Sequence, residues 1–346
     1  MEYDGSLMAT FKKKTIDEIA LLAGVSKATV SRVMNGTAPV AKETRRRVES
    51  AIKKTNYQPN VNARKLAGGS GGSIALVLEE STEEFFLNPF WKSVVDGFIS
   101  QAAHSHLHPV LFFHSKESSD QELVTALIRG NYDAIAIFGW HRDIKILEKY
   151  IPEKMRIVFG GKQGESSRFT YVGVDNIKGG YLATKHLLDA GCRNILTITG
   201  DLTVESSRER LEGYKQALAE KGIPIKKQFI LEGNFTEKSG ENAIKDFLRK
   251  PKVFDGIFAG NDLMARGAFR ILGELGIAVP QEVKIIGFDG SIVAKDHLPP
   301  LSTVGQPSFE LGVRVAEQLM LPMAETLENI ELDLELIQRK SSATSK

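Results

Sequence analysis

The 346-residue chain contains very little cysteine and no long apolar stretch. Its one cysteine, Cys192, excludes a disulfide within the chain, which is typical of a protein in the reducing cytoplasm. No run approaches the roughly 18 apolar residues of a membrane helix, and the polar start up to Lys14 is unlike a signal peptide. We therefore expect a cytoplasmic protein with no membrane partner, whose natural start could be Met1 or Met8.

The sequence also lacks the common motifs of enzymes and metal sites. It has no GxGxxG that opens a helix after a strand, no P-loop and no HExxH. His104, His106 and His108 lie close together, but they have no cysteine or carboxylate partners at ligand spacing. We expect neither an enzyme nor a cofactor, and no metal site.

Positive charge is concentrated at the N-terminus. Residues 1–70 carry 13 Lys and Arg against 6 Asp and Glu, whereas the remainder carries 32 against 37. A basic segment on an acidic body indicates an anionic polymer as the partner of that segment alone. A merely solvated N-terminus is the alternative.

The segment from Thr15 to Gly36 predicts two short helices joined by a tight turn. Thr15 and Glu18 form a capping box, and small or apolar residues follow at helical spacing up to Ala23. Gly24 permits the turn, and Ser26 begins the second helix. Such a pair can place its second helix in the major groove of DNA, and a third helix follows over residues 41–55. A plain three-helix bundle with solvated basic residues is the alternative.

The outward face of the second helix supplies the candidate DNA contacts. Arg32 can bond bidentately to guanine, and Lys27 and Ala28 sit where base edges are met. Polar side chains and a basic cluster are better suited to phosphate: Thr29, Ser31, Asn35 and Arg45–Arg47.

These residues resemble the DNA-binding head of the lactose-repressor family of bacterial regulators. The resemblance is carried by Thr15–Ala20, by Val25–Gly36, and by Asn56–Asn60 with Ala63–Ala67. It implies a hinge segment that becomes helical on operator DNA, where Arg64 contacts DNA and Leu66 wedges between base steps in the minor groove. Residues 58–73, which end in a glycine-rich run, are thus expected to form hinge and linker.

The rest of the chain alternates short apolar runs with amphipathic helices, which predicts parallel sheets covered on both faces. The expected strands are 74–78, 109–113, 134–138, 157–159, 194–198, 256–259 and 283–288, with helices over 90–104, 120–129, 177–190, 207–221, 237–249 and 262–275. We expect a body over 74–340 with two α/β lobes, one near 74–173 and 305–329, the other near 174–304 and 330–340. Ile330–Arg339 is expected to be one edge strand, and 1–14 and 341–346 to be an extension and a tail.

The same family resemblance, which extends to periplasmic sugar-binding proteins, implies a ligand cleft between the lobes. It is carried by Val172–Asn176, Ser207–Tyr214, Gly260–Asp262, Ile286–Asp289 and Pro299–Val304. By position it implies that the effector-binding residues are Phe90, Arg210, Phe235, Asn261, Asp289 and Gln306. Asn261 and Asp289 lie where strands end, as ligand-binding residues of open α/β sheets do.

Each of these assignments has a structural alternative. Phe90 and Phe235 could be core residues, Arg210 a solvated helix residue, and Asp289 the cap of a turn. The cluster Trp140–Arg142 could contact ligand or belong to the surface.

The fold class we expect is an all-α helix-turn-helix head on an α/β body like that of periplasmic binding proteins. The expected function is transcriptional repression by a nucleoid-associated homodimer on double-stranded operator DNA, controlled by a small effector, a sugar or sugar derivative. The alternatives are a sugar-binding protein without a regulatory role, an α/β enzyme fused to a DNA-binding head, and an activator of the same fold.

Overall fold

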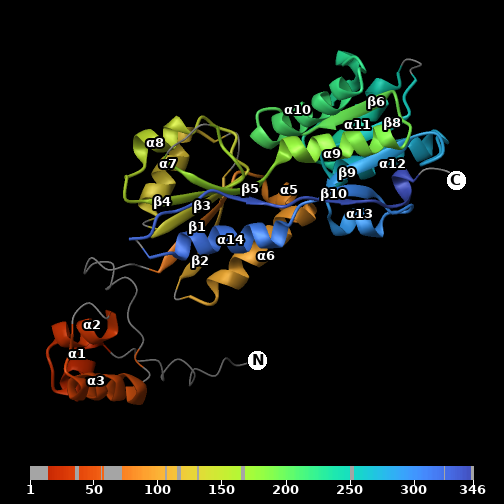
Figure 1. The fold of residues 1–346 in the computed structure, drawn as a ribbon. Coiled ribbons are helices and arrows are strands. Elements are labelled where there is room, and N and C mark those ends of the chain that lie inside the picture. The colour runs from red at the N-terminus through yellow and green to blue at the C-terminus, as the bar shows by residue number, and fades with distance from the viewer. Residues whose placement is uncertain are drawn as a thin grey trace, which may run out of the picture. The chain divides into compact units, whose positions relative to one another are not determined.

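The computed structural model divides the chain into two compact units, residues 1–71 and 72–346, which are considered separately (Figure 1). The structure describes residues 15–35, 39–55, 57, 72–105, 107–114, 118–130, 132–164, 168–249, 253–322 and 324–343. The expected extension 1–14, the hinge residues and nearly all of the linker lie outside these ranges. Within the described part, no helix combines the length and apolar character needed to cross a membrane.

The described residues of the first unit form three helices, α1 (Ile16–Ala23), α2 (Lys27–Asn35) and α3 (Lys42–Thr55). The predicted capping box is present, since Thr15 Oγ1 accepts from the Glu18 amide and Glu18 Oε2 accepts from the Thr15 amide. Gly24 ends α1 in the left-handed conformation, with φ at 61°, which glycine adopts without steric cost. A small core fixes the three helices to one another: Ile19, Ala20, Ala23, Val30, Val33, Val48 and Ala51.

The second unit contains two six-stranded sheets, one for each lobe. The first has the order β11-β5-β4-β3-β1-β2 and is built from β1 (Ser73–Leu78), β2 (His108–Phe113), β3 (Ala134–Phe138), β4 (Arg156–Gly160), β5 (Thr170–Val174) and β11 (Ile330–Leu332). The second has the order β12-β10-β9-β8-β6-β7 and is built from β6 (Ile195–Thr199), β7 (Ile230–Glu232), β8 (Gly256–Ala259), β9 (Lys284–Asp289), β10 (Ser302–Gly305) and β12 (Glu335–Ile337). Every strand pair is parallel except β10 with β12.

Helices lie beside both sheets (Figure 1). Those of the first lobe are α5 (Thr82–Leu87), α6 (Pro89–Ala102), α7 (Asp120–Arg129), α8 (Lys145–Tyr150) and α14 (Ser308–Met320). Those of the second lobe are α9 (Asn176–Asp189), α10 (Glu205–Glu220), α11 (Glu237–Phe247), α12 (Asp262–Glu274) and α13 (Ile292–Asp296), with short 3₁₀ turns at Lys227–Phe229 and Lys340–Ser342.

Strand β1 shows that the first sheet is covered on both faces. Ile74, Leu76 and Leu78 are fully buried in one apolar cluster, whereas Ala75 and Val77 are fully buried in another. Successive side chains of a strand point to opposite faces, so a core lies on each side of this sheet. The continuous apolar runs seen in the sequence have this cause.

The expectation of a single edge strand over Ile330–Arg339 is wrong. Ile330–Leu332 pairs in parallel with β5 in the first sheet, and Glu335–Ile337 pairs antiparallel with β10 in the second. The alternation of apolar and charged residues continues across both strands because each has one face against a core. That pattern carries no information about which sheet each strand joins.

The two lobes are connected by three crossings of the chain. They lie between β5 and α9, between β10 and α14, and between β11 and β12. In the second crossing, α14 returns to the first lobe and packs on α6, where Gly97 permits the approach: a Cβ there would lie 2.0 Å from the Phe309 carbonyl oxygen.

Candidate functional site

Helix α2 places the predicted DNA contacts on one exposed surface. Val30 and Val33 are buried in the core, whereas Lys27, Ala28 and Arg32 are exposed. The half-buried Thr29 and Ser31 flank them, and Ser26 Oγ accepts from the Thr29 amide at 3.2 Å, which caps the helix.

The remaining predicted DNA contacts are placed only in part. On α3, Arg46 and Arg47 are exposed and Arg45 is half-buried. The side chain of Asn35 and the whole of Arg64 and Leu66 lie outside the described residues.

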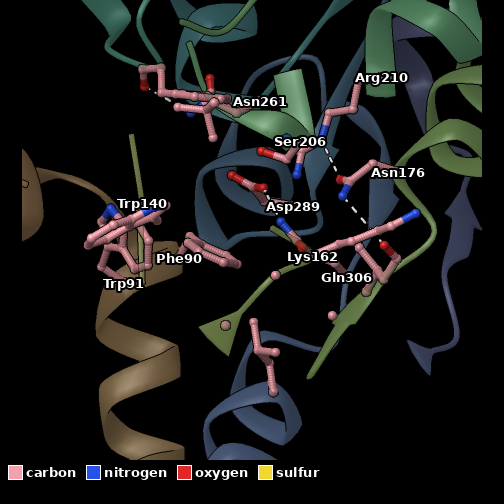
Figure 2. Close-up of a pocket in the computed structure, with 18 of the residues that line it drawn as sticks. Phe90, Trp91, Trp140, Lys162, Asn176, Ser206, Arg210, Asn261, Asp289 and Gln306 are labelled. Atoms are coloured by element: carbon pink, nitrogen blue, oxygen red, sulfur yellow. Dashed lines mark hydrogen bonds between the residues drawn. The ribbon is translucent and has the colours of Figure 1, made fainter. Parts of the chain in front are cut away.

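A cavity between the lobes of the second unit, which we call the inner cavity, is lined by all six residues predicted to bind an effector (Figure 2). These residues are Phe90, Arg210, Phe235, Asn261, Asp289 and Gln306. The cavity encloses about 890 Å³, counting the space open to solvent, which is within the usual range of small-molecule sites. Its lining residues come from both lobes, so neither lobe alone forms the cavity.

Arg210 is almost completely buried, so the expectation that it could be a solvated helix residue is wrong. Its Nε donates to Asn176 Oδ1 at 2.9 Å, and its Nη1 donates to the Gly260 carbonyl at 2.6 Å. The guanidinium carbon lies 3.7 Å from the centre of the Phe288 ring. Burial lowers the pKa of Arg210 to about 10, so the side chain remains a cation at neutral pH.

Helix α10 holds Arg210 rigidly because it packs backbone to backbone against α9. A Cβ at Gly180 would lie 2.1 Å from the Arg210 carbonyl oxygen, so only glycine allows this approach. Gly180, within α9, is therefore required by the helix packing behind the site.

Asp289 lies at the end of β9 in a strained backbone conformation, with φ at 111°. Such strain in a residue other than glycine is often found at functional sites. Its Oδ1 accepts a hydrogen bond from Gln306 Nε2 at 2.6 Å, and no capping of the following α13 by its side chain is present, so the turn-cap alternative is not supported. Burial raises the pKa of Asp289 to about 6, and the charge of Arg210 opposes this rise.

A second buried carboxyl group lies behind Asp289. Asp262 accepts hydrogen bonds from the amide and hydroxyl of Ser291 and from Thr303 Oγ1. Burial and the neighbouring charge of Asp289 raise the pKa of Asp262. These hydrogen bonds join the turn before α13, β10 and α12 next to the inner cavity.

Asn261 and Phe235 form one structural unit. Asn261 Oδ1 accepts from the Met264 amide and caps α12, while its Nδ2 donates to the Phe235 carbonyl at 2.8 Å. Phe235 has a left-handed backbone, with φ at 67°, and a Cβ at Gly200 would lie 2.1 Å from its ring. The Asn261 amide thus holds the strained Phe235 at the cavity wall.

Aromatic side chains of the first lobe gather on one side of the inner cavity, as Figure 2 shows for Phe90, Trp91 and Trp140. Asn88 caps α6 and places Phe90 and Trp91 in its first turn, with their ring centres 4.9 Å apart. An aromatic wall opposite charged and amide groups suits a ligand with one apolar face and several hydroxyl groups.

The residues of the cluster Trp140–Arg142 have two different positions: two line the cavity, and the third forms ion pairs that hold the loop. Trp140 and His141 line the cavity, whereas Arg142 forms ion pairs with the buried Glu79 and with Asp120. The Glu79 carboxylate also accepts from the His141 amide at 2.8 Å, which fixes this loop.

His141 also contacts the second lobe. Its Nδ1 lies 3.2 Å from Thr203 Oγ1 and 3.9 Å from a carboxylate oxygen of Asp201. This loop therefore joins the lobes at one side of the cavity.

Reasoning from the sequence missed several cavity residues. Lys162, Asn176, Ser206 and Trp91 also line it. Asn176 ends the quoted Val172–Asn176 segment, and its position after a strand was the available signal. Lys162 follows β4 after two glycines, and nothing in its local sequence indicated that it lines the site.

Other reactive side chains in the described residues show no catalytic arrangement. Burial raises the pKa of Cys192 to about 11, and its thiol donates to the Asp255 carbonyl. No group of three His, Cys, Asp or Glu residues suited to a metal occurs in the described residues, which exclude His106.

A helix-turn-helix unit in one chain with a two-lobed body that encloses a polar and aromatic cavity defines the class of ligand-responsive transcriptional regulators. Residues 15–60 match the profile of bacterial regulatory proteins of the lacI family, and residues 184–342 match that of the periplasmic binding protein-like domain. The chain belongs to the lacI family.

Relatives and solved structures match nearly the whole chain. The transcriptional regulator CelR of Thermobifida fusca is 33% identical over 94% of this chain and 96% of its own length, and DegA of Bacillus subtilis is 32% identical over 96% and 98%. Among structures, a complex of CelR with cellobiose has a TM-score of 0.73 and 31% identity, covering 95% of this chain and 100% of that one. The lac repressor dimer bound to operator and an anti-inducer has a TM-score of 0.79 and 26% identity, covering 96% and 99%. These relatives are transcriptional regulators and not enzymes.

Proposed function

We propose that this protein is a transcriptional repressor whose affinity for operator DNA is controlled by a neutral sugar or sugar derivative bound in the inner cavity. The observation that carries the proposal is the meeting of six separately predicted residues around one cavity, with aromatic rings on one side and Arg210, Asp289 and Gln306 on the other. Carboxylate and amide groups accept and donate to sugar hydroxyls, and aromatic rings pack on the apolar face of a sugar.

The DNA-binding role rests on α2. Arg32, Lys27 and Ala28 are exposed on the helix that enters the major groove in helix-turn-helix proteins. A homodimer would present two such helices to a two-fold symmetric operator, as the lac repressor dimer is described with its operator. We propose a dimer rather than a tetramer, and sedimentation that shows a stable tetramer would contradict this.

Effector control follows from linkage. A ligand that prefers one arrangement of the lobes shifts the operator-binding equilibrium, and operator binding must change the ligand affinity by the same factor. A sugar effector agrees with the relatives, since CelR is described with cellobiose and a regulator from Enterococcus faecium with ribose.

The test combines two measurements on the purified full chain. A duplex is first selected from random DNA by binding, and its affinity is compared with that of a scrambled duplex at physiological salt. Fluorescence anisotropy of that duplex is then measured during titration with individual sugars. We expect sequence preference that one sugar changes at least fivefold. Absence of sequence preference, with and without sugars, would contradict the DNA-binding role, whereas preference that no sugar alters would contradict the effector role alone.

A further inference from the structure

A second pocket adjoins the inner cavity. This outer pocket shares Glu80, Asn88 and Phe235 with the inner cavity and encloses about 1500 Å³, counting the space open to solvent. Its walls come from both lobes: α5 and the loop before it on one side, and α11, α12 and the loop before α11 on the other. A ligand too long for the inner cavity would therefore have the outer pocket beside it at Phe235.

Two of the residues that line both pockets, Phe235 and Asn88, are held in place by hydrogen bonds and packing. Phe235 is held through its carbonyl by Asn261 and its ring packs over Gly200. On the opposite lobe, Asn88 is engaged as the cap of α6, where its Oδ1 accepts from the Phe90 amide at 3.1 Å. Phe235 and Asn88 thus place an aromatic ring and an amide where the two pockets adjoin. Such a pair suits a chain of sugar units, whose rings alternate apolar faces with hydroxyl edges.

The charge of the outer pocket selects against anionic ligands. Its cations are already paired within the second lobe: Arg266 to Glu237 at 2.5 Å, and Arg270 and Lys238 to Glu241 at 2.8 and 2.9 Å. The described lining residues of the first lobe add three carboxylates and no cation, namely Glu80, Glu83 and Glu84. A phosphate or carboxylate group would have to compete with Glu237 and Glu241 for these cations.

We propose that the outer pocket is a subsite for the second unit of a neutral oligosaccharide whose first unit occupies the inner cavity. This inference rests on the proposed function, because it requires that the inner cavity binds a sugar. It goes beyond that function in naming the length and charge of the effector and the residues that select for them.

The first measurement is isothermal titration of the full chain with glucose, cellobiose, maltose, cellotriose and maltotriose. We expect at least one disaccharide to bind tenfold or more tightly than glucose, because the second unit adds contacts without a second loss of translational freedom. Glucose binding as tightly as the best disaccharide would overturn the subsite while leaving the sugar-effector function intact. No binding by any neutral sugar would contradict both proposals.

A pair of matched variants separates the subsite from a general effect on the protein. Leu87 lines the outer pocket and is 65% exposed, whereas its neighbour Phe86 is 78% exposed and is not among the lining residues. Leu87→Trp places a bulky ring beside the second sugar unit only. We expect it to change the ratio of disaccharide to glucose affinity at least fivefold, while Phe86→Trp leaves that ratio within twofold.

Two further results would overturn the proposal. An equal change in glucose and disaccharide affinity in Leu87→Trp would mean that the residue acts on the closing of the lobes and not on a bound second unit. A ratio within twofold of wild type in Leu87→Trp would mean that both sugar units fit within the inner cavity.

The charge argument has its own measurement. A disaccharide phosphorylated on one unit is expected to bind at least tenfold more weakly than its neutral parent at physiological salt. Tighter binding of the phosphorylated form would show that the paired arginines rearrange to receive an anion, and would overturn the neutral class of ligand.

Discussion

Effector affinity should fall as the pH is lowered from 7.5 to 5, because of Asp289. The carboxylate lies in the inner cavity, almost completely buried, with Gln306 as its hydrogen-bond donor and the Arg210 cation nearby. An ionised carboxylate can accept hydrogen bonds from two sugar hydroxyls, whereas a protonated one loses acceptor capacity. Binding of the effector should therefore require the ionised form.

The size of the effect follows from the pKa of Asp289, which burial raises to about 6. At pH 5 only about one molecule in ten would carry the charge, so the Kd should rise on the order of tenfold, or about 1 kcal/mol. The stability of the unliganded protein should change in the opposite direction. Because the folded pKa lies above the ordinary value of 3.8, this group favours the folded state most at low pH, and up to about 3 kcal/mol is lost as the pH rises through the folded pKa.

Intrinsic tryptophan fluorescence can report effector binding, because the two tryptophans of the chain, Trp91 and Trp140, both line the inner cavity. Titration of their fluorescence with the effector at several pH values gives the Kd directly. Asp289→Asn should bind more weakly at pH 7.5 and should lose most of the pH dependence. A wild-type Kd that is flat between pH 5 and 7.5, or a pH dependence that persists in Asp289→Asn, would refute the reasoning.

Three other variants test separate parts of the structure. Arg32→Ala should weaken binding to the selected duplex more than to random DNA, by about 1–3 kcal/mol, and equal losses in a binding titration would restrict Arg32 to phosphate. Gly180→Ala forces a Cβ against the Arg210 backbone and should lower the free energy of unfolding by about 1–3 kcal/mol and weaken effector binding. Gly273→Ala is its control, because nothing lies within 4 Å of the added Cβ, and denaturant titration should show no loss of stability. Asn261→Ala removes a helix cap and the hydrogen bond to Phe235 and should destabilise the protein by about 2 kcal/mol; an unchanged unfolding midpoint would contradict this role.

The sequence predicted those elements whose cause is local. Strands Ala134–Phe138 and Gly256–Ala259 have the predicted bounds, because each is a short apolar run in the sequence. The capping box at Thr15 and the left-handed Gly24 were also predicted, because both depend on residues close in sequence. The division of Ile330–Arg339 between two sheets was missed, because pairing with β5 and β10 is decided by contacts distant in sequence.

The inner cavity shows the same division. Residues at the ends of predicted strands, such as Asn261 and Asp289, could be placed from the strand pattern and the family resemblance. Lys162 was not predicted, and for Trp140 a ligand contact and a surface position were both left open. Both enter the cavity from loops whose course depends on glycine conformations and on the ion pair between Glu79 and Arg142. The pairing of Asn261 with the Phe235 carbonyl was also invisible, since it joins two loops 26 residues apart.

The three crossings between the lobes restrict how the protein can transmit a signal. The chain enters the body at Ser73, directly into β1 of the first sheet, whose Ser73 amide is held by the Asp133 side chain. Within one subunit the second lobe thus has no covalent route to the DNA-binding unit except through the first. The lobes are joined at three points, so an effector that contacted both Arg210 and Phe90 would be expected to draw the lobes toward each other. Along the chain, any change in the second lobe would reach the DNA-binding unit only through the first.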